Sequence, residues 1–378
     1  MNCEGMPESA GITEYLYRKS AAMRVPCSGT FEVTPLCNFQ CRMCYVRKSA
    51  AEAAASPRPM MALEDWMRLA REAREQGLLD LLITGGEPLL WPDFWPFYEE
   101  LIRMGFVVSV NTNGSLIDEA AVRRFRELPP RKINITLYGA SDETYRRLCG
   151  VNNVYARVIR GIRMLRQAGI LVKLNCSVTP CNSGDLEKIN DFARENGLFF
   201  SASAYMFPPV RRDSTATGVN TARFSPEETA AWRLKIYRIQ HSPEQYRRLL
   251  GDILAGASTP PGLDPSCAES EGDPMRCAAG RSSFWVTWDG WMTPCGTMCE
   301  PKTDAQALPF GRAWQQLTQE VDRIRLSGLC SRCPNLQLCH PCAAMAAAET
   351  GDPSRVPRFL CRISREMYRI ARQELQAP

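Results

Sequence analysis

Short β-rich runs alternate with longer amphipathic stretches from Gly29 to about Met206. The predicted strands cover residues 30–35, 78–86, 106–114, 132–139, 171–178 and 198–206. Between them, apolar residues at helical spacing predict helices over residues 63–77, 94–105, 117–128, 156–169 and 185–197. Several of these stretches end in Gly, which is favoured just past the C-terminus of a helix.

The order of these elements predicts the fold class. A strand followed by a helix, repeated about six times at a spacing of roughly 30 residues, indicates parallel strands joined by crossover helices. Six units fall short of the eight in a closed barrel, so we expect an α/β fold built on an open, partial (β/α)6 TIM-like barrel. In such folds the chemistry gathers where the C-terminal ends of the strands meet the following loops.

Beyond Met206 the alternation stops. A polar segment rich in Pro, Ser, Thr and Gly precedes a helical stretch over residues 226–254. From Cys267 onward cysteines become frequent and periodicity fades, which predicts a small Cys-rich domain folded around metal. The predicted domains are an N-terminal extension (1–28), the partial barrel (29–210), a linker with a helical segment (211–265) and the Cys-rich domain (266–378).

The composition indicates a globular protein with no nucleic-acid or membrane partner. The 378 residues are 45% hydrophobic and 23% charged, and the basic residues behind the formal charge of +5 are scattered among Glu and Asp. The first residues lack the basic and apolar regions of a signal peptide, and no run approaches the ~18 apolar residues of a membrane span. We therefore expect a soluble, cytoplasmic protein.

Cysteine is the residue type that points to inorganic chemistry. A long chain without an export signal keeps its thiols reduced, so metal ligation explains the 17 cysteines better than disulfides do. Because His241 and His340 are the only histidines, a His-rich zinc centre or a Ser-His-Asp hydrolase is nearly excluded.

Three cysteines follow the first predicted strand at intervals of four and three residues, namely Cys37, Cys41 and Cys44, and the aromatic Tyr45 comes next. A cubane 4Fe–4S cluster takes one thiolate per iron, so three cysteines leave one iron without a protein ligand. A cofactor needs such an open position to bind the metal, just as a catalytic zinc keeps one position open. The alternatives are three buried cysteines or part of a zinc site completed from elsewhere in the chain.

This spacing resembles the signature of the radical S-adenosylmethionine (SAM) superfamily. The resemblance implies a SAM-binding 4Fe–4S cluster that reductively cleaves SAM to a 5′-deoxyadenosyl radical, which abstracts a hydrogen atom from the substrate. About forty residues later, Gly85, Gly86, Glu87 and Pro88 match the superfamily motif that meets the methionyl amino group. Glycines let a backbone approach a ligand closely, and a carboxylate accepts hydrogen bonds from an ammonium group.

Weaker correspondences occur at the ends of the later strands. In relatives a hydroxyl and a downstream basic residue contact the SAM ribose and carboxylate, which indicates Thr136 and one of Arg146 or Arg147, of which we choose Arg147. Asn113 and Tyr45 are further expected cofactor contacts. The adenine or substrate side is expected to include Asn175, Ser177, Tyr205 and Met206, which ordinary barrel packing explains nearly as well.

The C-terminal cysteines resemble the SPASM extension of radical SAM enzymes, whose seven cysteines bind auxiliary 4Fe–4S clusters. The resemblance implies two auxiliary clusters, an outer one on Cys330, Cys333, Cys339 and Cys361 and an inner one on Cys277, Cys295 and Cys342. The chain departs from the family pattern between Cys339 and Cys342, which are separated by two residues where relatives usually have three.

The inner set needs a fourth ligand, and three options stay open. Cys267 is the first choice, Cys299 is the second, and the third is an open iron to which the substrate binds directly. Zinc is an alternative metal for the whole region, because Cys-x2-Cys pairs also build zinc ribbons with tetrahedral all-thiolate sites.

The resemblance implies a SPASM-type radical SAM enzyme. Many members modify ribosomally made peptides or proteins by crosslinking, epimerisation or oxidation, assisted by the auxiliary clusters. We therefore expect a peptide or protein substrate and an external electron donor such as flavodoxin or ferredoxin. Members that form formylglycine carry an acidic residue where this chain has Gly296, which argues against that activity.

The segment before the first strand is short. Its 28 residues are fewer than the ~80 of the winged-helix peptide-recognition domain often fused to such enzymes. A leader peptide is then expected to be read by this chain's own surface or by a separate protein.

A competing function is a non-catalytic iron–sulfur or zinc scaffold that carries electrons or binds a partner. It predicts closed four-cysteine sites throughout the chain, which the three-cysteine loop contradicts.

Overall fold

A nine-stranded sheet forms the centre of the protein. The computed structural model describes residues 8–256, 271–275 and 277–376, and the strand order in its main sheet is β10-β9-β8-β1-β2-β3-β4-β5-β6. Neighbours from β1 to β6 are parallel, so the predicted α/β partial barrel is confirmed. Its strands are β1 (Ser28–Glu32), β2 (Asp80–Thr84), β3 (Val107–Thr112), β4 (Lys132–Thr136), β5 (Val172–Ser177) and β6 (Phe199–Ser203).

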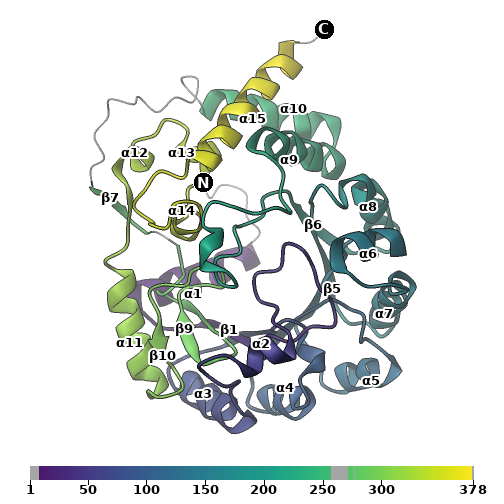
Figure 1. The fold of residues 1–378 in the computed structure, drawn as a ribbon, viewed down its shortest axis with the longest axis vertical. Helices are drawn as coiled ribbons and strands as arrows, with labels where there is room; N and C mark the ends of the chain where they lie inside the picture. Colours follow the sequence, from purple (N-terminus) through teal and green to yellow (C-terminus); the bar gives the residue numbers. More distant parts are fainter. Residues whose placement is uncertain (1–7, 257–270, 276, 377–378) are drawn as a thin grey trace.

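The crossover helices line the outside of this sheet (Figure 1). The five predicted ones are α3 (Leu63–Glu75), α4 (Phe94–Arg103), α5 (Glu119–Glu127), α7 (Tyr155–Gln167) and α8 (Leu186–Glu195). The alternation did not predict α1 (Glu8–Met23), α2 (Ala50–Ala54) or α6 (Asp142–Cys149). A local signal for α6 was present, because the Ser141 side chain caps it by accepting from the backbone of Thr144.

The C-terminal region extends the barrel sheet, which the sequence did not predict. The extension consists of β8 (Ser283–Val286), β9 (Trp291–Thr293) and β10 (Thr303–Asp304), and β8 pairs in parallel with β1. β8 and β9 pair antiparallel through a turn that includes Asp289 and Gly290, and Cys295 lies two residues beyond β9.

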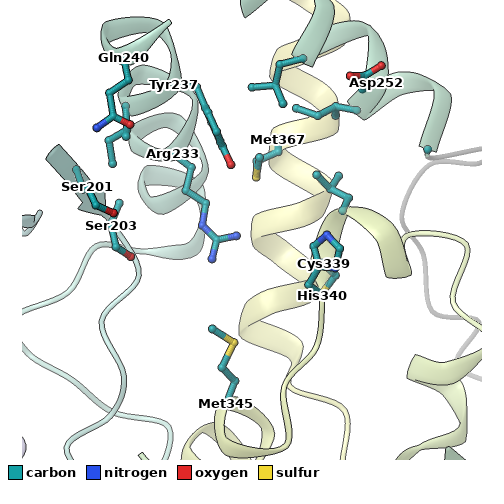
Figure 2. Close-up of a pocket in the computed structure, with 17 residues that line it drawn as sticks. Ser201, Ser203, Arg233, Tyr237, Gln240, Asp252, Cys339, His340, Met345 and Met367 are labelled. Atoms are coloured by element: carbon teal, nitrogen blue, oxygen red, sulfur yellow. The ribbon is translucent and has the colours of Figure 1, made fainter. Parts of the chain in front are cut away.

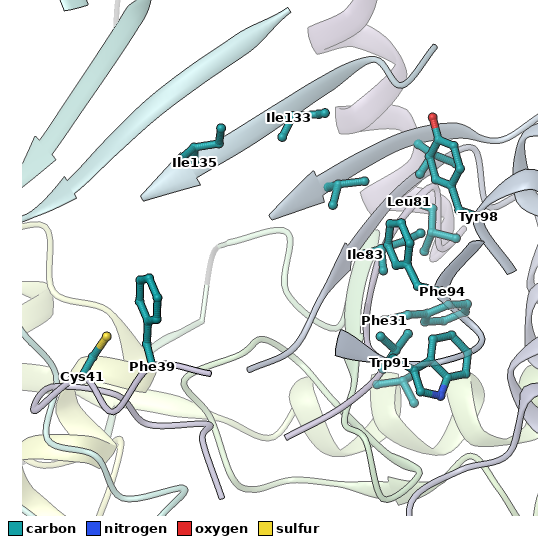
Figure 3. Packing of buried hydrophobic residues seen from close by; sticks show 14 of the residues in the cluster. Phe31, Phe39, Cys41, Leu81, Ile83, Trp91, Phe94, Tyr98, Ile133 and Ile135 are labelled. Carbon is teal, nitrogen blue, oxygen red and sulfur yellow. The ribbon is translucent and has the colours of Figure 1, made fainter. Parts of the chain in front are cut away.

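The main hydrophobic core explains why this extension joins the barrel. Phe284 of β8 packs against Phe31 of β1 and Phe310, with ring centroids 6.2 and 5.1 Å apart. Gly29 leaves the space for it, since a Cβ there would approach the Phe284 ring to 2.5 Å. Figure 3 shows Phe31 with its aliphatic and aromatic neighbours, and Phe39 beside Cys41.

A second buried cluster joins the predicted helical segment to the last helix. The segment divides into α9 (Pro226–Gln240) and α10 (Pro243–Gly256), and both pack on α15 (Arg358–Gln376). Leu234, Leu250 and Ile363 lie at the centre of the cluster.

The remaining helices and strands are α11 (Phe310–Val321), α12 (Gly328–Ser331), α13 (Leu336–Cys339), α14 (Ala343–Thr350), β7 (Glu271–Pro274) and β11 (Arg325–Ser327), with the 3-10 turns η1 (Pro88–Leu90), η2 (Ser183–Asp185) and η3 (Ser214–Ala216). Among the helices described, none has the length and apolar character needed to cross a membrane.

Candidate active site

The loop after β1 carries the three-cysteine motif and is anchored to α6. The backbone N–H of Gln40 donates to the carbonyl of Cys149 at 2.7 Å. The Cys37 sulfur accepts from the N–H of Phe39 at 3.3 Å, and the Cys44 sulfur accepts from a backbone N–H at 3.2 Å. Hydrogen bonds of this kind favour the thiolate form, which is the form that ligates iron.

The three thiols lie close enough to interact electrostatically. Burial is the largest of the effects that raise the pKa of Cys37 to about 12, and the charges of Cys41 and Cys44 contribute. The pKa of Cys41 is raised chiefly by a hydrogen bond with the Cys149 thiol. Cys149 thus lies next to the motif, although its spacing in the sequence gave no reason to include it. With pKa values raised in this way, iron binding must displace thiol protons.

The three thiols of the loop have the chemistry of iron–sulfur cluster ligands. Among the Cys, His, Asp and Glu residues that the structure describes, no three are arranged to hold one ion. In a cubane cluster each thiolate ligates a separate iron, so the ligands need not converge on one point. Cys41 and Cys44 also line the cavity above the loop, and one side of such a cluster would face that space.

This cavity lies at the C-terminal ends of the barrel strands and has a volume of about 360 Å³. It brings together seven residues of the predicted site, which are Cys41, Cys44, Tyr45, Gly85, Gly86, Asn113 and Thr136. It also contains three of the residues expected on the adenine or substrate side, namely Ser177, Tyr205 and Met206. Residues that the sequence did not single out complete the wall, including Met43, Tyr138, Ser203, Phe207 and Trp285.

The two glycines bring the second loop against the cysteine loop. The backbone N–H of Gly86 donates to the carbonyl of Thr34 at 2.7 Å. A Cβ on Gly86 would lie 2.4 Å from the carbonyl oxygen of Leu36, and one on Gly85 would lie 2.6 Å from that of Thr34. Only glycine permits this approach, so the motif fixes the relative position of the two loops.

Glu87 is buried behind the cavity wall, with no exposed surface. Its carboxylate accepts hydrogen bonds from the hydroxyl of Thr112 at 2.8 Å and from the backbone N–H of Asn113 at 2.7 Å. It also accepts from the N–H of Leu89 at 3.2 Å. These bonds tie the loop after β2 to the end of β3, so Glu87 organises the wall, and its expected contact with the SAM amino group remains a prediction.

The titration of Glu87 predicts how stability depends on pH. Burial raises the pKa of Glu87 to about 7. Between about pH 4.5 and 7 the folded protein therefore retains a proton that the unfolded chain has released, and the free energy of unfolding falls as pH rises. At about 1.4 kcal/mol per pKa unit, the loss is about 3 kcal/mol by pH 8.

Urea unfolding of the reduced, metal-free protein between pH 5 and 8 measures this fall. Glu87→Gln should be less stable overall, because it loses an acceptor, but it should show a much smaller dependence on pH. Glu127→Gln, at an exposed position of α5, should keep the wild-type dependence. An equal dependence in Glu87→Gln would contradict the assignment.

Of the residues predicted to contact the ribose and the carboxylate of SAM, some line the cavity and others lie at the surface. Asn113 and Thr136 line the cavity, and the Asn113 amide donates to the side chain of Asn38 in the cysteine loop at 2.8 Å. Arg147 is exposed on α6 and donates to the carbonyl of Cys181, while Arg146 pairs with Glu143. Neither arginine lines the cavity in this structure, so a carboxylate contact from Arg147 requires movement of its side chain.

A buried ion pair beneath the cavity was missed at the sequence level. Arg211 donates to both carboxylate oxygens of Glu32 at 2.8 and 2.9 Å and to the carbonyl of Gly296 at 2.8 Å. The indole of Trp285 donates to Glu32 at 3.0 Å, and the guanidinium lies 5.6 Å from the ring of Tyr45. Glu32, between the apolar Phe31 and Val33 at the end of β1, was the available signal, because a buried carboxylate requires a partner.

The four cysteines expected to hold the outer auxiliary cluster lie near one another, and their role as its ligands stays a prediction. Burial and the charges of Cys361, Cys339 and Cys333 raise the pKa of Cys330 to about 12. These four come from α12, the following turn, α13 and α15, which explains why spacing alone does not define the set.

The described residues include only part of the expected ligand set of the inner auxiliary cluster. Although Cys277 is exposed, partial desolvation raises its pKa, and the Cys342 and Cys295 thiols contribute. Cys299 interacts with Cys295 and with Arg211. Cys267 lies outside the described residues, so the choice of fourth ligand stays a prediction.

Comparisons with known proteins identify relatives in sequence and in fold. A sequence profile described as the Radical SAM superfamily matches residues 31–193. The AdoMet-dependent heme synthase of Methanosarcina barkeri is 24% identical over 334 residues, which cover 85% of this chain and 92% of that protein.

Two solved structures have the same fold over most of their length. Streptococcus suis SuiB bound to precursor peptide SuiA matches with a TM-score of 0.62 and 18% identity, covering 96% of this chain and 83% of SuiB. Native anSMEcpe with bound AdoMet matches with a TM-score of 0.64 and 17% identity, covering 92% of this chain and 97% of anSMEcpe.

Proposed function

The chain belongs to the radical SAM superfamily, with a cysteine-rich C-terminal region of the SPASM type, and from this we propose that it modifies a ribosomally made peptide or protein by hydrogen-atom abstraction. The observation that carries the proposal is the three-cysteine loop, whose Cys41 and Cys44 face a cavity at the ends of the barrel strands. We place the reaction in the cytoplasm, where an external donor such as flavodoxin or ferredoxin supplies the electron.

When bound, SAM and the 4Fe–4S cluster supply reductive cleavage to a 5′-deoxyadenosyl radical. Cys37, Cys41 and Cys44 would hold that cluster. Gly85 and Gly86 would bring backbone groups to the methionyl part of SAM, and Asn113 and Thr136 are positioned to orient the remainder. The aromatic and apolar side chains in the wall would limit the access of water to the reacting centre, which protects a reactive intermediate from side reactions.

A peptide substrate is supported by the likeness to SuiB, which has been solved with its precursor peptide. A second candidate is a heme-type tetrapyrrole, favoured by the heme synthase relative that matches along 92% of its own length. The two candidates share the proposed SAM chemistry and differ in the group that enters the cavity.

Anaerobic reconstitution followed by addition of SAM and dithionite tests the proposed activity. We expect release of 5′-deoxyadenosine, measured by liquid chromatography and mass spectrometry. A protein that binds iron and releases none under these conditions would be the non-catalytic scaffold.

The auxiliary clusters give a separate prediction. Cys333→Ala should lower the iron content of the reconstituted protein by about four atoms per chain, because one cubane cluster loses a ligand. Colorimetric iron analysis together with zinc analysis measures this, and Cys181→Ala, outside all three cysteine groups, serves as the control. Stoichiometric zinc in the wild-type protein, or no loss of iron in the variant, would contradict the prediction.

A further inference from the structure

A second cavity lies beside the edge strand β6, between α9 and the C-terminal helices. Its volume of about 690 Å³ falls in the range of about 300–1,000 Å³ typical of small-molecule sites. Figure 2 shows the guanidinium of Arg233 projecting from α9 into this space, on the side that faces α15 and His340.

Arg233 differs from the other basic residues on the second half of α9. Lys235 pairs with Glu187 at 2.9 Å, and Arg238 pairs with Glu374 at 2.6 Å. Within the described part of the chain, Arg233 has neither a hydrogen bond nor an ion pair. Cys339, an expected ligand of the outer cluster, also lines the cavity, and its thiol interacts with Arg233. A partly desolvated guanidinium offers donors in a planar fork that matches a carboxylate.

The rest of the polar lining consists mostly of groups that can both donate and accept hydrogen bonds. The Nε2 atom of Gln240 is buried and has no partner among the described residues. The hydroxyls of Ser201 and Tyr237 also line the cavity, and Asp252 of α10 is the one carboxylate described there. The donor in this cavity that a ligand can reach and that the chain does not pair is the Arg233 guanidinium, which favours a carboxylate.

The second cavity adjoins the SAM cavity at the end of β6. Ser203 lines both of them. A substrate whose reacting carbon lies in the SAM cavity can therefore extend a polar group past the end of β6 toward Arg233. The second cavity is therefore a neighbour of the candidate active site.

We propose that the cavity beside β6 is a substrate subsite that binds a carboxylate group through Arg233. The proposal rests on the proposed function, since it treats the cavity as part of the same active site. The carboxylate is either an acidic side chain of a peptide or a side chain of a heme-type tetrapyrrole.

Binding to the anaerobic holoenzyme with SAM present tests this subsite. The two probes are a dansylated Ala-Glu-Ala-Glu-Ala peptide and mesoporphyrin, a metal-free porphyrin with two carboxylates. Their neutral controls are the matching glutamine peptide and the dimethyl ester. We expect one acidic probe to bind at least ten times more tightly than its neutral control, and the probe that does so identifies the source of the carboxylate.

Variants then assign the interaction to Arg233. Arg233→Gln should weaken binding of that probe at least tenfold. Arg238→Gln, on the same helix but outside the cavity lining, should bind like the wild type. The subsite is overturned if neither acidic probe is preferred, or if Arg233→Gln shifts the reduction potential of a cluster while probe binding stays unchanged.

Release of 5′-deoxyadenosine by the wild-type protein without probe tests the proposed function independently. If the protein cleaves SAM but prefers neither acidic probe, the subsite proposal is wrong and the proposed function is unaffected. If the protein binds an acidic probe through Arg233 but does not cleave SAM, the catalytic assignment is wrong and the carboxylate site is retained.

Discussion

Replacing Cys44 by alanine is expected to reduce the release of 5′-deoxyadenosine at least a hundredfold, to the background level. Cys44 is one of only three thiols in its loop and lines the cavity directly. Without it, two irons of a cubane cluster would lack a protein ligand, so the cluster would be lost or unable to hold SAM. The measurement is the yield of 5′-deoxyadenosine after anaerobic reconstitution with dithionite and SAM.

A matched control lies at the other end of the same strand. Cys27 precedes β1, its thiol lies 3.6 Å from the carbonyl of Ser282, and it is not among the residues that line the cavity. Cys27→Ala should retain the wild-type yield. Circular dichroism of both variants separates loss of the cluster from loss of the fold. Wild-type release of 5′-deoxyadenosine by Cys44→Ala would refute the assignment of this loop.

The second large effect is expected on stability. Arg211→Met should lower the free energy of unfolding by about 3–5 kcal/mol, because it leaves the fully buried Glu32 without its counter-charge. Burial already raises the pKa of Glu32, and Arg211 is the main group opposing that rise. Loss of the pair should also release Trp285 and Tyr45, so tryptophan fluorescence during urea unfolding reports the change.

Two further variants show whether the uncompensated charge is the cause. The double variant Glu32→Gln with Arg211→Met should recover most of the lost stability, because no buried charge remains. Arg103→Met, which breaks exposed pairs with Glu99 and Glu100 on α4, should change the free energy of unfolding by about 1 kcal/mol or less. Similar losses in Arg211→Met and Arg103→Met would show that the pair contributes no more than a surface contact.

The sequence by itself determined the barrel strands and the motifs at their ends. Alternation of strand and helix located all six strands of the barrel, because local periodicity reflects which side of an element is buried. The predicted ends were long by a few residues. The third predicted strand, for example, included the turn at Gly114, which leaves the strand with a φ of 77°. Cys41, Gly86 and Thr136 line one cavity, because parallel strands have their C-terminal ends at the same edge of the sheet.

Only the tertiary structure decided how distant segments meet. The strand β8 joins β1, and Arg211 pairs with Glu32 across 179 positions of sequence. Arg147 faces the surface, whereas Arg233 faces a cavity beside β6. Periodicity along a chain reports whether a position is buried, but it carries no information on which distant residue lies opposite. Partner choice depends on packing and charge compensation in the assembled core, and those exist only once the whole chain has folded.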